Sequence, residues 1–197
     1  MANVGGNLKN LQVYSMEQRQ QLLAEKQRVV AEVLAGTMKS FKPLPAKELF
    51  DKQFETVRSR YKFLVVCGFS GTGKTVFCKN ITGDPSECLE VNCANCPEPD
   101  LRAYDPFKHK AVLFDEASPA MVISQKKLFQ CPPVPVSLGM STTNCHAYSI
   151  FVSGCRFVIC SNTWVEDVGR MQKDGDKEWL AANSIVADIG STRLWQE

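Results

Sequence analysis

No stretch of this 197-residue sequence is apolar over the ~20 residues that a bilayer-spanning helix needs, and its first residues contain no apolar core typical of a signal peptide. Neither sign of charge is in excess, because 23 Lys and Arg residues stand against 21 Asp and Glu residues. That balance gives no argument for a nucleic-acid partner from charge alone. Internal repeats and low-complexity segments are also missing. We therefore expect a soluble globular protein with no membrane partner, large enough for one well-buried domain.

Cysteine, in contrast, is plentiful, with nine residues in the chain. This number, in a sequence of otherwise ordinary composition, predicts a reducing intracellular compartment and free thiols. Cys67 and Cys160 lie inside apolar runs, where cysteine acts as a small buried hydrophobe. Cys93 and Cys96 form a C-x-x-C pair with Cys88 nearby, but no second pair or spaced histidine accompanies them. The pair is therefore a weak signal for zinc.

Charge is unevenly distributed along the chain. Residues 1–62 hold 11 Lys and Arg residues and 6 Asp and Glu residues, whereas residues 63–197 hold 12 and 15. The basic first third has two interpretations, which both stay open here. It can contact a polyanion, or it can be the solvated face of a helix.

The first third also predicts helices. We expect residues 1–14 to form a flexible tail and residues 15–60 a helical segment, in which Ser15 and Gln18 can form a capping box and Gly36 can end the first helix. That helix carries an apolar stripe: Leu22, Leu23, Val29, Val30, Val33 and Leu34. The stripe packs either on the domain's own core or on another subunit, so this segment is a candidate for oligomerisation.

Residues 61–197 show the pattern of an α/β domain. After a second predicted helix over residues 46–60, short apolar runs at residues 63–67, 111–114 and 157–160 are typical of parallel strands that are buried on both faces. Residues 131–152 alternate in the manner of a hairpin, and a helix over 176–182 and a strand over 184–189 complete the domain. This order favours an αβα sandwich around a mainly parallel sheet.

A phosphate-binding loop follows the first of these strands. Residues 68–75 match G-x-x-x-x-G-K-[ST] at every required position, and the residues that we expect to cradle a nucleotide are Gly68, Phe69, Ser70, Gly71, Thr72, Gly73, Lys74 and Thr75. The glycines let backbone N–H groups approach a phosphate closely. Lys74 would contact the β- and γ-phosphates, and the Thr75 hydroxyl would bind Mg²⁺. The loop predicts a nucleoside triphosphate, taken as ATP, with magnesium.

Polar residues end the next two apolar strands. Asp115 and Glu116 follow one strand; we expect Asp115 to hold the magnesium and Glu116 to act as the general base for an attacking water. Asn162 ends the other strand and is placed to bond the γ-phosphate or that water. Glu116, Asn162 and Lys74 are predicted catalytic residues.

This ordered trio resembles the ATPase domain of superfamily 3 helicases. It is most similar to that of the replication initiator proteins of circular single-stranded DNA viruses and their integrated relatives. Residues 63–190 carry the resemblance, including the hairpin region between the second and third motifs. The resemblance implies an AAA+-like P-loop fold and a ring-type homo-oligomer such as a hexamer. It also implies single-stranded DNA or RNA as partner, a role in viral-type DNA replication, and location in the nucleus or cytoplasm of a host cell.

Three features depart from that family. Residues 136–141 of the hairpin have no basic residue where the family usually presents a lysine, so His146 and the pair Lys126 and Lys127 are the nearest substitutes. Residues 179–183 lack the family's arginine finger, which Arg170 can supply in trans. The chain also has no room for the endonuclease domain that normally comes first. The related helicases of picornavirus-like RNA viruses fit less well, since no cysteine follows Cys160.

Two other functions compete with a helicase-type ATPase. A P-loop kinase for small molecules usually needs an Arg-rich lid, and residues 131–152 contain no arginine. The other alternative is a nucleotide-dependent assembly module that has little or no unwinding activity. The missing hairpin lysine and the missing finger keep that alternative open.

Overall fold

The computed structural model describes residues 40–94, 96, 98–139 and 147–196, together with residues 18, 20–22, 24–25 and 28. By internal contacts the chain divides into two units, Met1–Ser40 and Phe41–Glu197. The described residues between 18 and 28 are helical, as the sequence predicts. The predicted tail and the remainder of the first predicted helix lie outside the described residues.

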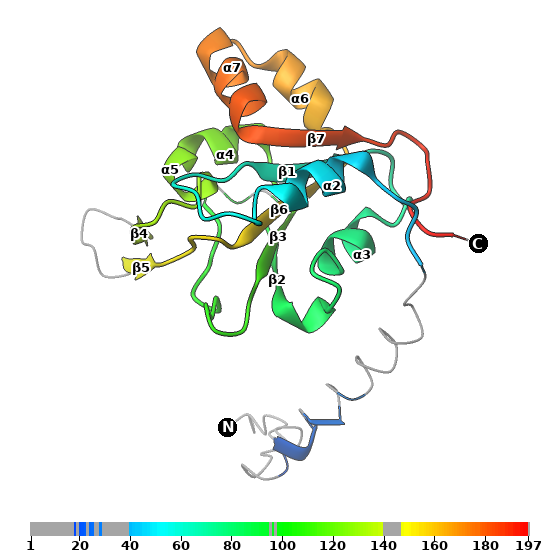
Figure 1. The fold of residues 1–197 in the computed structure, drawn as a ribbon, viewed down its shortest axis with the longest axis vertical. Helices are drawn as coiled ribbons and strands as arrows, with labels where there is room; N and C mark the ends of the chain where they lie inside the picture. Colours follow the sequence, from blue (N-terminus) through cyan, green and yellow to red (C-terminus); the bar gives the residue numbers. More distant parts are fainter. Residues whose placement is uncertain are drawn as a thin grey trace, which may run out of the picture. The chain divides into compact units, whose positions relative to one another are not determined.

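A five-stranded parallel sheet forms the centre of the second unit (Figure 1). Its strands lie in the order β2 (Cys88–Asn92), β3 (Ala111–Asp115), β6 (Arg156–Ser161), β1 (Phe63–Cys67) and β7 (Ser184–Asp188). All five residues of β1 are buried, in agreement with the continuous apolar run that predicts it. The predicted strands at 63–67, 111–114, 157–160 and 184–189 are all confirmed, whereas β2 was not predicted because its residues mix apolar and polar types without a clear period.

Helices cover both faces of this sheet. Successive residues of β1 point to opposite faces: Phe63 and Val65 join a cluster with residues of α4 (Pro119–Ser124), α5 (Lys126–Phe129), α6 (Trp164–Arg170) and α7 (Asp174–Asn183). Leu64 and Val66 join the cluster on the other face with residues of α2 (Pro45–Lys52) and α3 (Lys74–Lys79). A short 3₁₀ helix, Pro85–Glu87, precedes β2. The predicted αβα sandwich is thus confirmed.

The second predicted helix is wrong in its length. The sequence predicts it over residues 46–60, but α2 ends at Lys52. The reason is Gln53, whose side-chain amide donates to the Lys62 carbonyl at 2.9 Å and accepts from the Lys62 N–H at 2.7 Å. These two bonds fold the chain back toward β1. Since Phe50 of α2 is fully buried in the core, residues 41–60 pack with the α/β unit.

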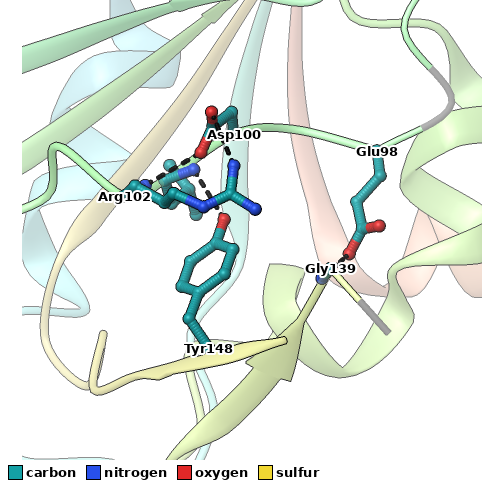
Figure 2. Close-up of polar contacts among 6 residues, drawn as sticks. Glu98, Asp100, Arg102, Gly139 and Tyr148 are labelled. Carbon is teal, nitrogen blue, oxygen red and sulfur yellow. Dashed lines mark hydrogen bonds and ion pairs between the residues drawn. The ribbon is translucent and has the colours of Figure 1, made fainter. Parts of the chain in front are cut away.

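The predicted hairpin region contains two antiparallel strands, β4 (Val136–Leu138) and β5 (Tyr148–Ile150). His146, with the rest of residues 140–146, lies outside the described residues. Figure 2 shows how the segment before β3 holds the hairpin at the loop end of its two strands: the Tyr148 hydroxyl accepts the Leu101 N–H at 2.8 Å, and Glu98 accepts the Gly139 N–H at 2.8 Å. The Arg102 guanidinium lies 4.8 Å from the centre of the Tyr148 ring. These contacts therefore anchor the ends of β4 and β5 that lie next to the connecting residues.

Candidate nucleotide site

The loop between β1 and α3 adopts a conformation that only its glycines favour. Gly71 and Gly73 have φ angles of 79° and 88°, in the left-handed region. Gly73 has a second constraint, because a Cβ atom there would lie 2.1 Å from the ring of Trp195. Thr72 stabilises the turn by donating its hydroxyl to the Phe69 carbonyl at 2.9 Å. The predicted loop is thus a tight turn followed at once by α3.

Lys74, the first residue of α3, is only 5% exposed. A buried ammonium group needs several acceptors. Lys74 Nζ donates to the carbonyl oxygens of Gly68 at 2.8 Å and Phe69 at 2.7 Å, and to Asn162 Oδ1 at 2.9 Å. The lysine of the first motif therefore contacts the asparagine of the third directly.

Asn162 continues the chain of hydrogen bonds to the second motif. Its Nδ2 donates to Glu116 Oε1 at 2.9 Å. The contact follows from the topology, since β6 lies between β1 and β3 and all three strands are parallel. Their carboxyl ends meet at one edge of the sheet. Lys74, Asn162 and Glu116, far apart in sequence, thus form one network.

Glu116 is held in an unusual backbone conformation. Its φ angle is 57°, in the left-handed region that non-glycine residues seldom occupy. Its N–H donates to the Cys160 carbonyl at 2.9 Å, which joins the turn after β3 to β6. Such strain is a frequent feature of functional sites. Asp115, the last residue of β3, is half-buried and is paired in register with Cys160.

A cavity of about 300 Å³ opens at these strand ends. Its walls come from the loop and α3 (Ser70, Gly71, Gly73, Lys74, Thr75 and Val76), from the ends of β3 and β6 (Glu116, Cys160 and Asn162), and from Trp195. Residues of all three sequence motifs (the loop, Glu116 and Asn162) thus line the same cavity. Gly71, Gly73 and the first residues of α3 line one side of the cavity.

Thr75 and Asp115, the two residues that the sequence assigns to magnesium, carry a hydroxyl and a carboxylate. Mg²⁺ prefers hard oxygen ligands and usually takes only one or two carboxylates, with substrate phosphates and water as the other ligands. Within the described residues no group of three or more His, Cys, Asp or Glu side chains could hold a metal by itself, and this includes Cys93 and Cys96. A magnesium ion here would therefore depend on the bound nucleotide.

Two thiols lie beneath the loop. Cys160 Sγ is 3.5 Å from the Thr75 hydroxyl oxygen. A hydrogen bond from the Cys78 thiol lowers the pKa of Cys160, and burial raises the pKa of Cys78 well above its usual range. The sequence predicts Cys160 only as a buried hydrophobe. Its place in the wall of the cavity could not be inferred from an apolar run.

Other candidate residues lie apart from this network. Arg170, at the end of α6, has a side chain that is 72% exposed and pairs with Glu166 and Asp167 of the same helix. Lys126 pairs with Asp176 at 2.7 Å, and Lys127 is exposed on α5. In the part of the chain that the structure describes, none of these cations contacts Lys74, Asn162 or Glu116.

Trp195 lines the cavity although no sequence pattern predicts it there. Backbone bonds hold its segment against the loop: the Leu194 N–H donates to the Thr72 carbonyl at 3.0 Å, and the Lys42 N–H donates to the Leu194 carbonyl at 2.7 Å. Phe41 and Trp195 form an isolated antiparallel bridge. No motif in the sequence marks a tryptophan so far from the loop.

The strand order and the loop after β1 are those of a P-loop NTPase of the AAA+-like type. No protein-family model and no curated protein matches the sequence. Among solved structures, NtrX from Brucella abortus in complex with ADP is similar with a TM-score of 0.43 and 14% identity, over 90% of this chain and 46% of that one. The S. cerevisiae Hsp104–ADP complex is similar with a TM-score of 0.42 and 15% identity, over 88% of this chain and 37% of that one. The chain spans less than half the length of either protein.

Within the described residues, no helix combines the length and the apolar character that crossing a membrane requires.

Proposed function

We propose that this protein binds ATP with magnesium in the cavity at the strand ends and hydrolyses it. The observation that carries the proposal is the hydrogen-bonded chain from Lys74 through Asn162 to Glu116. A buried cation, an amide and a carboxylate in this order supply what phosphoryl transfer to water needs: a group for the phosphate charge, a group that orients, and a base.

In this proposal each residue has a separate task. Lys74 holds the β- and γ-phosphates, Thr75 and Asp115 hold Mg²⁺, and Glu116 accepts the proton of the attacking water. Asn162 keeps the Glu116 carboxylate oriented through the bond at 2.9 Å. The bound ion supplies neutralisation of charge on the phosphate oxygens.

The finer proposal is a superfamily 3 helicase-type ATPase that acts as a ring on single-stranded nucleic acid, in viral-type DNA replication. Its support is the order of the three motifs and the anchored hairpin between the second and the third. The parallel sheet gives this hairpin a definite location, because β5 leads into the amino-terminal end of β6, away from the nucleotide cavity.

A nucleotide-dependent assembly module is the second candidate. Two observations favour it: Arg170 is paired with acids of its own helix, and the described part of the hairpin strands has no basic residue. A P-loop kinase for a small molecule is the third candidate, and the absence of arginine from residues 131–152 counts against it.

One set of measurements separates these functions. ATP hydrolysis is measured with and without single-stranded DNA and RNA, and the oligomeric mass is measured with and without nucleotide. Turnover that nucleic acid stimulates, in a ring, supports the helicase type. Assembly upon nucleotide addition with negligible turnover supports the assembly module, and phosphate transfer to a small acceptor supports the kinase.

A matched pair of variants tests nucleotide binding itself. Lys74→Ala removes the buried ammonium, whereas Lys79→Ala removes a cation from the end of the same helix that pairs with Glu90. Binding of a fluorescent ATP analogue is expected to be lost in the first variant and retained in the second. If Lys74→Ala binds ATP with magnesium as tightly as the parent, the proposed function is wrong.

A further inference from the structure

A groove of about 350 Å³ lies between the end of α2, the residues that lead into β1 and the end of α7. Its charged lining consists of Lys52, Arg58, Arg60 and Lys62, all of which are exposed. Among the described residues no carboxylate lines this groove. We call these four residues the basic cluster.

The basic cluster differs from many other cations of the domain. Several Lys and Arg side chains elsewhere pair with an acid, as Lys47 does with Asp51 and Lys110 with Glu87. None of the four cluster side chains has an ion pair within the part of the chain that the structure describes. The nearest acids in sequence, Asp51 and Glu55, line a different groove. The charge of the cluster is therefore not neutralised by the described residues.

The backbone that carries the cluster is fixed by specific contacts. The Tyr61 hydroxyl accepts the Arg58 N–H at 3.1 Å, and the Tyr61 ring stacks on Phe54 with the ring centres 5.0 Å apart. Gln53 donates to the Lys62 carbonyl and accepts from the Lys62 N–H, so these two bonds hold the Lys62 backbone. The backbone of Arg58 and of Lys62 is therefore held in place beneath the cluster.

The cluster also lies beside the start of the hairpin segment. The Tyr61 N–H donates to the Gln130 carbonyl at 3.0 Å, and the Gln130 side chain contacts Asn183 at 3.4 Å. Lys62 directly precedes β1, and the hairpin strand β5 precedes β6. Because β1 and β6 are neighbouring parallel strands, their amino-terminal ends lie at the same edge of the sheet. The cluster and the hairpin thus share the amino-terminal edge of the sheet, opposite the nucleotide cavity.

We propose that the basic cluster binds the phosphate backbone of single-stranded nucleic acid. The proposal rests on the proposed function and supplies the phosphate contacts that the poorly basic hairpin lacks. Four exposed cations along one groove suit a row of solvated phosphates. A single small anion would instead need donors that converge in a buried pocket.

The test compares two variants that lose the same charge. Lys52→Gln/Arg58→Gln/Arg60→Gln/Lys62→Gln removes the cluster, and Lys47→Gln/Lys79→Gln/Lys173→Gln/Lys177→Gln removes four cations elsewhere. Binding of fluorescein-labelled oligo(dT) and oligo(U) is measured by anisotropy at several salt concentrations, and binding of a fluorescent ATP analogue is measured in parallel. The cluster variant is expected to bind both oligonucleotides at least about tenfold more weakly than the control variant. The slope of log Kd against log salt should fall by about 0.7 for each phosphate that the variant no longer neutralises.

Three results would overturn the proposal: equal affinity and slope in the two variants, an equal decrease of affinity in both, or no oligonucleotide binding by a parent protein that does bind and hydrolyse ATP. The last result leaves the proposed ATPase function intact, whereas failure of the ATP measurements in the parent removes that function itself. If the fourfold variant does not fold, Arg58→Gln/Arg60→Gln replaces it, because both side chains are exposed. The same comparison then applies, with Lys173→Gln/Lys177→Gln as control.

Discussion

Three polar side chains, one from each motif, meet at the carboxyl end of the central sheet. Lys74 is buried and would be costly to hold there without the carbonyl oxygens of the loop and Asn162. Asn162 in turn orients Glu116, whose backbone is strained. Each of these residues depends on the next, so single substitutions should affect binding and turnover differently.

Glu116→Gln should separate nucleotide binding from hydrolysis. Glutamine keeps the shape and can still accept from Asn162 Nδ2, but it cannot take a proton from water. We expect turnover to fall by about 10²–10⁴-fold with ATP affinity nearly unchanged. Steady-state hydrolysis and equilibrium binding check this, with Glu55→Gln, an exposed acid outside the cavity, as control. Parental turnover in Glu116→Gln would show that the base is another group.

His109 should make stability depend on pH. Its Nδ1 accepts the Asp105 N–H at 2.9 Å, which requires the neutral ring, and burial lowers the pKa of His109. As pH falls below the unfolded value of about 6.5, the unfolded chain takes up the proton first, so the free energy of unfolding decreases. Above that value this contribution is fully present. Urea unfolding at several pH values across this range measures the free energy of unfolding. That free energy should change less with pH in His109→Gln than in His146→Gln. An equal dependence of the free energy of unfolding on pH in the two variants would contradict the prediction.

At the scale of elements, the segment after β7 completes the cavity. It is fastened by backbone bonds to Thr72 and Lys42, and this brings Trp195 onto Gly73. An aromatic ring in the wall of a nucleotide cavity offers a surface for the base. The short segments at 41–42 and 194–195 thus shape a site whose chemistry lies elsewhere in the sequence.

Trp195→Ala should weaken ATP binding and leave binding of inorganic tripolyphosphate unchanged. Stacking of a base on an aromatic ring contributes about 1–3 kcal/mol, which corresponds to roughly 5- to 150-fold in Kd. Trp195→Phe keeps a ring and should retain most of the affinity. Isothermal calorimetry with the two ligands checks this. An equal loss of affinity for both ligands would mean that Trp195 supports the loop and does not contact the base.

At the scale of the whole molecule, the described α/β unit begins at Phe41 and buries Phe50 of α2 in its own core. We therefore predict that this unit folds without residues 1–40. A chain that lacks these residues should unfold at nearly the parental temperature and retain ATP binding. If the first helix is a subunit contact, the shortened chain should also lose nucleotide-dependent assembly. Calorimetry and light scattering measure both, and loss of folding would contradict the division into two units.

Arg170 offers a test of subunit contacts. Its ion pairs with Glu166 and Asp167 are exposed and contribute about 0–1 kcal/mol, so Arg170→Ala should fold normally. If it acts in trans, turnover should fall by about 10³-fold or more. Mixing Arg170→Ala with Glu116→Gln subunits should then restore part of the activity, because some interfaces combine an intact base with an intact arginine. Mixtures without recovery would exclude a role in trans.

Local chemistry in the sequence determined the loop of residues 68–75, the buried strands and the acid and amide at their ends. Glycine conformations and continuous apolar runs depend on near neighbours, so they can be recognised without coordinates. The same rules failed for α2, because Gln53 ends that helix through bonds to a residue beyond it. The tail and most of the first helix stay predictions, as do the roles assigned to the site residues.

Only the tertiary structure decided what those strand ends contact. The order β3-β6-β1 places Asn162 between Lys74 and Glu116. Folding also brought Trp195 onto Gly73 and gathered the basic cluster beside the hairpin segment. These contacts join residues far apart in the chain. Sequence patterns report which residues a strand buries and where it ends, whereas strand order and the docking of the terminal segment arise from packing of the whole domain.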